Sequence, residues 1–126
     1  EHPYRDTCAI ANLSSETSTQ PRLLIHGVDR HAVSTSSNLL RPLARDASRT
    51  VGHIIDPQTG KPVETEYDSV SVAAERGWQS DAFSTAIFAK GPALAETIAR
   101  NAPGVRAFFI YPDGTALLVP EDKPAE

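Results

Sequence analysis

The sequence predicts an α+β fold in which a mainly antiparallel sheet packs against a pair of helices. Residues 68–74 alternate polar and apolar side chains, which is the pattern of a strand. Residues 80–101 show helical spacing, and an Asp-Gly pair at 113–114 separates two later apolar runs, as in a hairpin. Strands followed by helices and a closing hairpin are typical of α+β proteins, and 126 residues suffice for one small domain.

The first third of the chain predicts short strands separated by polar segments. Residues 1–22 are expected to form a polar N-terminal segment, with a possible short strand at 8–11 before a run rich in Ser and Thr. Residues 23–26 predict a strand and residues 27–30 predict a turn. Residues 31–35 are then expected to return beside residues 23–26 as the second strand of a hairpin.

The middle of the chain predicts two further strands. Residues 50–55 are rich in β-branched side chains and run into residues 56–62, where Asp, Pro and Gly give a strong turn signal. The alternation over residues 68–74 predicts a strand with one buried and one exposed face.

The last third predicts two helices and a hairpin. Ser80 and Asp81 are expected to begin the first helix, because a hydroxyl caps free N–H groups and a carboxylate complements the positive helix end. Gly91 ends that helix, and a second follows over residues 92–101 with Pro92 in its first turn. The residues predicted to face the core are Ala82, Phe83, Ala86 and Ile87 in the first helix and Leu94 and Ile98 in the second. Strands are expected at 107–111 and 115–119. The folded unit is then 23–120, with a frayed tail at 121–126.

Composition excludes several classes of protein. The net charge of −4 and the lack of a basic face argue against a nucleic-acid binder. No apolar run approaches the roughly 20 residues that a membrane-spanning helix needs. The single cysteine, Cys8, excludes an internal disulfide framework and a zinc site built from several cysteines. Because the chain begins with Glu1 rather than Met, we expect the true N-terminus to lie upstream.

His53 and Asp56 are the first candidate functional residues. They bracket the end of the strand predicted at residues 50–55, and strand ends present side chains to ligands from a rigid support. His53 could act as a general base, because the unperturbed pKa of histidine is close to neutral. The simpler interpretation is that His53 ends the strand and Asp56 opens a turn.

Asp81 and Thr85 are the second candidates. They are four residues apart, so a helix places their oxygens on one face, and such oxygens suit Mg²⁺ or Ca²⁺. The simpler interpretation is that Asp81 complements the helix dipole while Thr85 bonds back to a carbonyl. The other histidines (His2, His26 and His31) lack metal-ligand spacing and are expected to be surface or strand residues.

Taken together, these stretches resemble the FAD:protein FMN transferases of the ApbE family from about residue 23 to residue 119. Residues 53–62 read His-Ile-Ile-Asp-Pro-Gln-Thr-Gly-Lys-Pro and are similar to the family's most recognisable signature. Residues 32–36 resemble its serine/threonine turn, and residues 69–72 resemble the strand after the signature. Residues 81–86 are similar to its metal-binding helix start. Residues 103–105 and 113–114 resemble its closing hairpin.

The resemblance implies a magnesium-dependent transferase that splits FAD and attaches FMN to a threonine of a target flavoprotein. It implies that Asp81 and Thr85 are ligands of Mg²⁺, that His53 is the catalytic base and that Ile54 contacts FAD through its backbone. It also implies a periplasmic or membrane-associated location.

Two departures from the family pattern bear on these expectations. Ser37 stands where the family's small turn usually ends in glycine, and the family's earlier half, which helps to hold FAD, has no counterpart. The chain is therefore expected to be the C-terminal portion of such a protein, with edges or a face of the sheet 23–25, 50–55 and 68–74 left open. A complementary N-terminal chain or a second copy would cover them. The alternative is a noncatalytic relative that serves as a flavin-binding or protein-interaction module.

Overall fold

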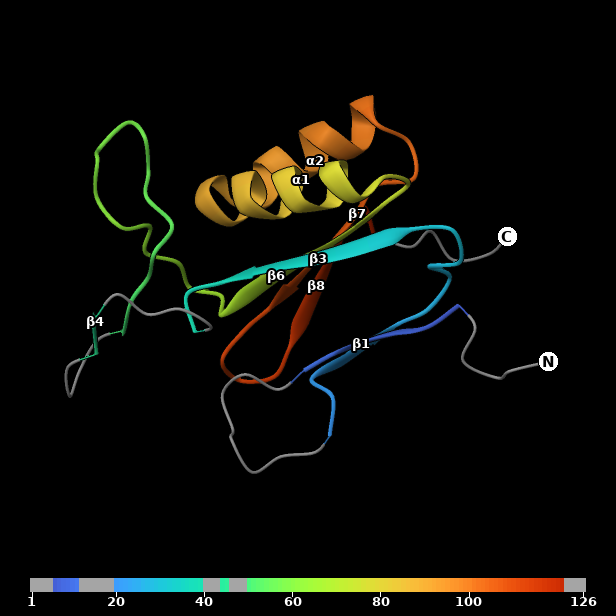
Figure 1. Ribbon diagram of the computed structural model, residues 1–126, viewed down its shortest axis with the longest axis horizontal. Helices are drawn as coiled ribbons and strands as arrows, with labels where there is room; N and C mark the ends of the chain where they lie inside the picture. The colour runs from blue at the N-terminus through green and yellow to red at the C-terminus, as the bar shows by residue number, and fades with distance from the viewer. Residues whose placement is uncertain (1–5, 12–19, 40–43, 46–49, 122–126) are drawn as a thin grey trace.

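The computed structural model describes residues 6–11, 20–39, 44–45 and 50–121 (Figure 1). Within them it confirms an α+β fold. The elements in chain order are β1 (Cys8–Ile10), β2 (Leu23–Ile25), β3 (Ala32–Ser37), β4 (Ala44–Arg45), β5 (Thr50–Val51), β6 (Ser69–Ala74), α1 (Gly77–Lys90), α2 (Pro92–Asn101), β7 (Arg106–Ile110) and β8 (Ala116–Val119). The expected frayed tail beyond residue 121 and the polar run at 12–19 lie outside the described residues.

A four-stranded antiparallel sheet in the order β3-β6-β7-β8 forms the centre of the fold. Both helices cover one face of this sheet, and β1 with β2 lies across the other face (Figure 1). The described part of the sheet therefore has cover on both sides, although its strands β3 and β8 form the edges. The expected open face is not found there, because Ile10, Ile25 and Val28 pack on it.

The larger of two cores lies between the sheet and the helices. Ile87 and Phe88 of α1 are fully buried there against Phe109 of β7. The aromatic ring of Tyr67, which precedes β6, meets Phe88 and Phe109 edge to face at 5.6 and 5.0 Å between centroids. Apolar burial on this scale is the main stabilising contribution in a small domain.

Strand β6 is buried on both faces, which corrects the prediction of one exposed face. All six of its residues are buried, including Ser69 and Ser71. Ser71 is satisfied because its hydroxyl lies 2.8 Å from the hydroxyl of Thr35 on β3. Alternating serines suggest a solvent face, but a buried hydroxyl is equally stable once it has a hydrogen-bond partner.

The predicted hairpin between residues 23–26 and 31–35 is wrong. Strand β2 pairs with β1, as Cys8–Ile25 and Ile10–Leu23 neighbours show, while β3 pairs with β6. The strand expected over residues 50–55 is also shorter, because β5 ends at Val51 and only an isolated bridge joins Ile55 to Pro62. The segments 23–25, 50–55 and 68–74, which were expected to share one sheet, thus belong to three different sheets. The closing hairpin of β7 and β8 is confirmed.

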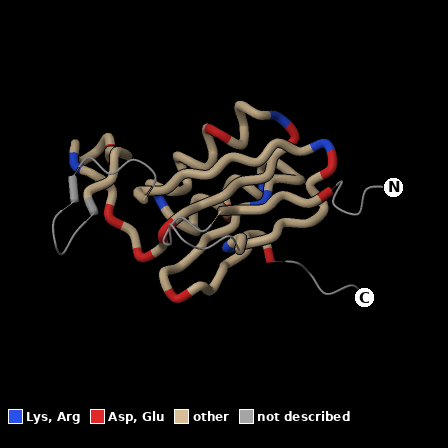
Figure 2. Tube along the Cα trace, turned by 60° about the horizontal axis from the view of Figure 1, so that its bottom comes forward, with Lys and Arg blue, Asp and Glu red and all other residues tan. Residues whose placement is uncertain are grey.

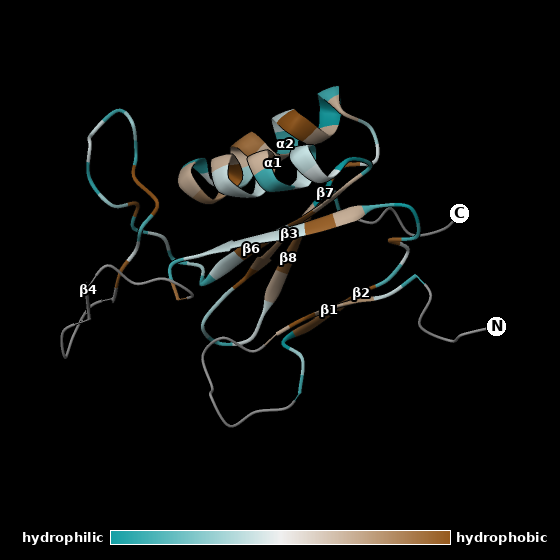
Figure 3. Cartoon of the chain, viewed as in Figure 1, coloured by the Kyte–Doolittle hydropathy of each residue, from teal (hydrophilic) through white to brown (hydrophobic). Residues whose placement is uncertain are grey.

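Helix α1 begins at Gly77, three residues before the predicted start. Gln79 stabilises this end, since its side-chain oxygen accepts from the Arg76 N–H at 3.3 Å. The buried face of α1 consists of Ser80, Ser84, Ile87 and Phe88. Of the four residues expected to face the core, Ile87 is buried and Phe83 is half-buried, but Ala82 and Ala86 are exposed. The reason is that α1 packs on the polar strand β3, which is pale along most of its length in Figure 3.

Candidate functional site

Residues 52–63, called the signature segment below, leave β5 as an irregular loop that projects beside the sheet (Figure 1). Ile54 and Val63 anchor its two arms, because both side chains are buried in the larger core. The Val63 N–H donates to the Ile54 carbonyl at 2.9 Å. His53, next to the first anchor, is exposed and makes no side-chain hydrogen bond with any described residue.

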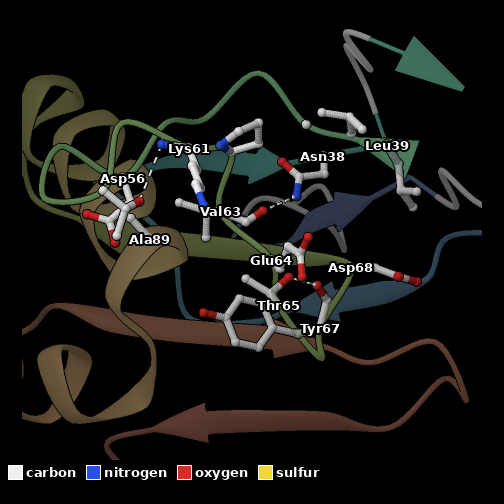
Figure 4. A pocket seen from close by; sticks show the side chains of 14 residues that line it. Asn38, Leu39, Asp56, Lys61, Val63, Glu64, Thr65, Tyr67, Asp68 and Ala89 are labelled. Atoms are coloured by element: carbon white, nitrogen blue, oxygen red, sulfur yellow. Dashed lines mark hydrogen bonds between the residues drawn. The ribbon is translucent and has the colours of Figure 1, made fainter. Parts of the chain in front are cut away.

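Asn38, in the turn after β3, fixes the start of the signature segment. Its side-chain amide donates to the Val63 carbonyl at 3.1 Å (Figure 4). Its side-chain oxygen lies against Gly52, where an added Cβ would stand only 1.7 Å away. Gly52 is therefore required by a close approach rather than by its backbone angles. Sequence reasoning missed Asn38, although a glycine beside an expected strand indicates such an approach.

The side chain of Asp56 stabilises the turn and does not interact with His53. One carboxylate oxygen accepts from the Gln58 N–H at 2.9 Å and from the Lys90 ammonium at 3.3 Å. The Gln58 N–H, and to a lesser extent Lys90, lower the pKa of Asp56. The Lys90 ammonium also donates to the side-chain oxygen of Gln58 at 3.1 Å. This arrangement agrees with the simpler interpretation of Asp56, in which it opens the turn.

A cavity of about 1020 Å³ lies beside the signature segment, between the turn after β3 and the end of α1 (Figure 4). The charged residues that line it are Asp56, Lys61, Glu64 and Asp68, and Tyr67 forms part of its wall. Burial raises the pKa of Asp68, although Arg22 at 3.8 Å opposes this shift. Burial likewise raises the pKa of Tyr67. None of the four predicted site residues lines this cavity.

Asp81 and Thr85 are both exposed on α1, one turn apart. The Thr85 hydroxyl lies 3.3 Å from the Asp81 backbone carbonyl and 3.2 Å from the hydroxyl of Ser36. The Asp81 carboxylate has no partner among the described residues. The first of these contacts is the back-bond of the simpler interpretation, while the free carboxylate leaves room for a cation. No hydrogen bond joins His53 to either residue in the described part of the chain.

Hydroxyl pairs join β3 to α1 along a contact that we call the β3–α1 seam. Ser34 lies 2.9 Å from Ser80, and Ser36 lies 3.0 Å from Ser84, in each case between hydroxyl oxygens. Ser80 and Ser84 are fully buried. Residues 32–37 form this strand, which confirms the strand predicted at 31–35, and the turn that residues 32–36 were expected to resemble follows at Asn38.

Ser37 fits its position without strain. It is buried, its hydroxyl donates to the Asp68 carbonyl at 2.8 Å and accepts from the Leu39 N–H at 3.0 Å. Its φ angle is not positive, since Arg30 alone among the described non-glycine residues has a positive φ. A side chain at this position therefore neither forces the backbone into the left-handed region nor points away from the fold.

The remaining candidate residues have structural partners or lie outside the description. The imidazole of His26 lies 3.0 Å from the Thr7 hydroxyl, and that of His31 lies 2.9 Å from the Asp29 carbonyl. Cys8 is a free thiol, and His2 is outside the described residues. The described chain contains no cluster of three or more His, Cys, Asp or Glu side chains suited to a metal.

Charges of both signs are distributed along the chain, and Figure 2 shows Lys and Arg interspersed with Asp and Glu. Neither described helix is long and apolar enough to cross a membrane.

Residues 7–109 match the sequence model of the ApbE family. This chain belongs to the ApbE family. It is 42% identical over 97 residues to an FAD:protein FMN transferase of Treponema pallidum, covering 77% of this chain and 26% of the relative. It is 33% identical over 87 residues to the FAD:protein FMN transferase of Escherichia coli, covering 69% of this chain and 24% of the relative.

Solved ApbE structures share the fold. The ApbE protein of Thermotoga maritima superposes with a TM-score of 0.64 at 24% identity, over 88% of this chain and 35% of that one. The apo flavinyl transferase ApbE of Pseudomonas stutzeri gives a TM-score of 0.59 at 28% identity, over 89% and 33%. The chain thus spans about a quarter of the length of its curated ApbE relatives and a third of these structures.

Proposed function

We propose that this chain is the C-terminal, metal-carrying part of a magnesium-dependent FAD:protein FMN transferase. Its substrates would be FAD and a threonine of a target flavoprotein. Membership of the ApbE family and similarity to FAD:protein FMN transferases support flavin transfer. The observation that carries the metal assignment is the exposed pair on α1, in which the Asp81 carboxylate has no protein partner and Thr85 lies one turn away.

The residues on α1 fit a hard cation. A carboxylate and a hydroxyl one helical turn apart are oxygen donors of the kind that Mg²⁺ prefers. When bound, Mg²⁺ would offset the negative charge of the FAD pyrophosphate and of the departing phosphate. Two side chains fill only part of the coordination shell, so this chain by itself should bind the cation weakly.

His53 would act on the acceptor threonine. The threonine oxygen forms a bond to the phosphorus of the FMN half of FAD, the pyrophosphate bond breaks, and AMP leaves. His53 takes the proton of the threonine hydroxyl, and its exposed ring without a described partner leaves a nitrogen available for this role. Ile54 would contact FAD through its N–H, because its carbonyl already accepts from Val63.

A noncatalytic flavin-binding or protein-interaction module is the second candidate. The observation that favours it is Ser37, whose side chain stands where the family's small turn usually ends in glycine. Under either proposal a complementary N-terminal chain or a second copy would pair with the edge strands β3 and β8. By family resemblance the location would be periplasmic or membrane-associated.

Two experiments on the native protein distinguish these proposals. Intact-mass measurement and size-exclusion chromatography with light scattering should detect a companion polypeptide or a second copy. Incubation with FAD, Mg²⁺ and an acceptor flavoprotein should then yield equal amounts of AMP and of acceptor that carries covalently bound, fluorescent FMN. FAD binding without AMP release would favour the noncatalytic module, and a monomer that binds FAD unaided would contradict the need for a partner.

A further inference from the structure

A chain of hydroxyl groups leads from the interior of the β3–α1 seam to the exposed face of α1. Ser36 Oγ lies 3.0 Å from Ser84 Oγ and 3.2 Å from Thr85 Oγ1. Ser84 Oγ donates to the backbone carbonyl of Asp81 at 3.0 Å. Ser36 and Ser84 are buried, whereas Thr85 and Asp81 are exposed. The chain of hydroxyls therefore ends on the residues proposed to bind the cation.

The number of hydroxyl protons available indicates which group donates in each of these hydrogen bonds. Each hydroxyl donates one proton and accepts through two lone pairs. Ser84 gives its proton to the Asp81 carbonyl, which makes Ser84 the acceptor for Ser36. Ser36 then accepts from Thr85 at 3.2 Å, and Thr85 also donates to the Asp81 carbonyl at 3.3 Å, so these two acceptors share its one proton. Because its proton is directed toward Ser36 and the Asp81 carbonyl, Thr85 Oγ1 keeps both lone pairs available to the exposed side.

We propose that Ser36 is a positioning residue for the cation site, because it accepts the Thr85 proton and turns the lone pairs of Thr85 Oγ1 outward. This inference rests on the proposed binding of a divalent cation by Asp81 and Thr85. A cation on Thr85 Oγ1 makes the hydroxyl proton more positive, which strengthens its hydrogen bond to Ser36. Ser36 itself does not touch the cation and acts only through Thr85.

Ser34 provides a matched control on the same strand. It lies two residues before Ser36, and its hydroxyl is 2.9 Å from that of Ser80, which donates to the Gly77 carbonyl at 2.9 Å. This contact also joins β3 to α1 through a pair of serines. It does not reach Thr85, so Ser34→Ala removes a similar hydrogen bond without changing the cation ligands.

Direct Mn²⁺ binding to the native protein that contains this chain tests the proposal. Free Mn²⁺ is followed by electron paramagnetic resonance, a readout independent of turnover. We expect Ser36→Ala to weaken Mn²⁺ binding about tenfold, the effect of losing one hydrogen bond to a charged centre. Ser34→Ala should leave the affinity unchanged while lowering the melting temperature to a similar extent. Asp81→Ala should remove binding at this site.

A second variant keeps the test decisive if Ser36→Ala folds poorly. Thr85→Val keeps the shape of the side chain and removes its hydroxyl, so it should weaken Mn²⁺ binding at least as much. Combined with Ser36→Ala it should add nothing, because both act on one ligand. Unchanged affinity in Ser36→Ala, equal weakening by Ser34→Ala, or additive losses would overturn the role of Ser36. Wild-type affinity in Asp81→Ala would instead overturn the metal site itself.

Discussion

The two regions that carry the proposed site residues are held in opposite ways. Asp81 and Thr85 lie on a regular helix that is joined to β3 through the hydroxyl pairs of the seam and packed through Ile87 and Phe88. His53 lies on the signature segment, whose one β contact is an isolated bridge and which is held by two buried anchors, by Asn38 and by the contacts of Lys90 with Asp56 and Gln58.

This difference predicts how each region responds to substitution. In the β3–α1 seam, several hydrogen bonds between hydroxyl groups together hold α1 against β3. Removing one hydroxyl should therefore leave the position of α1 unchanged. In the signature segment, few contacts restrain the backbone, so a single misplaced atom near Asn38 or Gly52 should move His53. The variants below test this contrast, beginning with the largest expected effect.

Asp81→Ala should abolish metal-dependent flavin transfer, because it removes the proposed charged ligand. Since the Asp81 carboxylate is exposed and has no described partner, the melting temperature should hardly change. AMP release at increasing Mg²⁺ concentrations measures the effect. Glu96→Ala, which removes an exposed carboxylate from α2, is the control and should behave as wild type. Unchanged metal dependence in Asp81→Ala would defeat the assignment.

His53→Ala should slow transfer by roughly 100-fold or more, the usual scale for loss of a general base. FAD binding, followed by flavin fluorescence, should stay nearly intact because the imidazole makes no described contact. His31→Ala is the control, because the one side-chain hydrogen bond of His31 among the described residues is with the Asp29 carbonyl. A loss of FAD binding with a normal residual rate would show that His53 is structural.

Gly52→Ala should destabilise the protein by about 1–3 kcal/mol and should also slow transfer, because overpacking next to His53 displaces the segment. The new Cβ would meet the Asn38 side-chain oxygen at 1.7 Å. Urea unfolding measures the loss, and Gly77→Ala, which meets no atom within 4 Å, is the control. Asn38→Ala should reduce the cost of Gly52→Ala in the double variant. Additive costs would show that this clash is not the cause.

Lys90→Ala should have the smallest effect, which is a slight loss of stability at pH values where Asp56 is ionised and a small rise in the pKa of Asp56. Because the folded-state pKa of Asp56 is lowered, its contribution to stability is present above the ordinary pKa of 3.8 and is lost as pH falls through the lower folded value. Removing Lys90 should raise the pKa of Asp56 only partly, since the Gln58 N–H is the larger cause. A carboxyl NMR titration measures this. A return to the ordinary value would contradict that order of causes.

Local signals in the sequence predicted the elements but not their partners. Pro92 and Gly91 correctly mark the start of α2, and the Asp113–Gly114 turn forms with the Asp113 carboxylate accepting from the Thr115 N–H. The pairing of β2 with β1 across residues 11–22 depends on packing against the sheet, which no short pattern contains. Apart from β4, which no local signal indicated, the existence of the strands was therefore predictable, whereas their assignment to layers was not.

In the candidate site, too, local spacing was predictable, whereas contacts between residues distant in the sequence were not. The four-residue spacing correctly placed Asp81 and Thr85 together on an exposed helix face. The hydroxyls behind them were not predicted to be buried, because serines at alternate positions suggest solvent and their partners on α1 come about 50 residues later in the chain. Asn38 was missed for a similar reason, since only the fold brings it to Gly52.

The burial of both faces of β6 affects which parts of the backbone become exposed to solvent when the molecule opens locally. Its six residues are buried and its backbone pairs with β3 on one edge and β7 on the other. Amide protons in such a strand exchange with solvent only when the whole domain unfolds. The signature segment has few backbone hydrogen bonds and should exchange through local opening. If a bulky substrate binds beside His53 as proposed, it could be admitted while the central strand stays closed, so that access and global stability would be set by different parts of the chain.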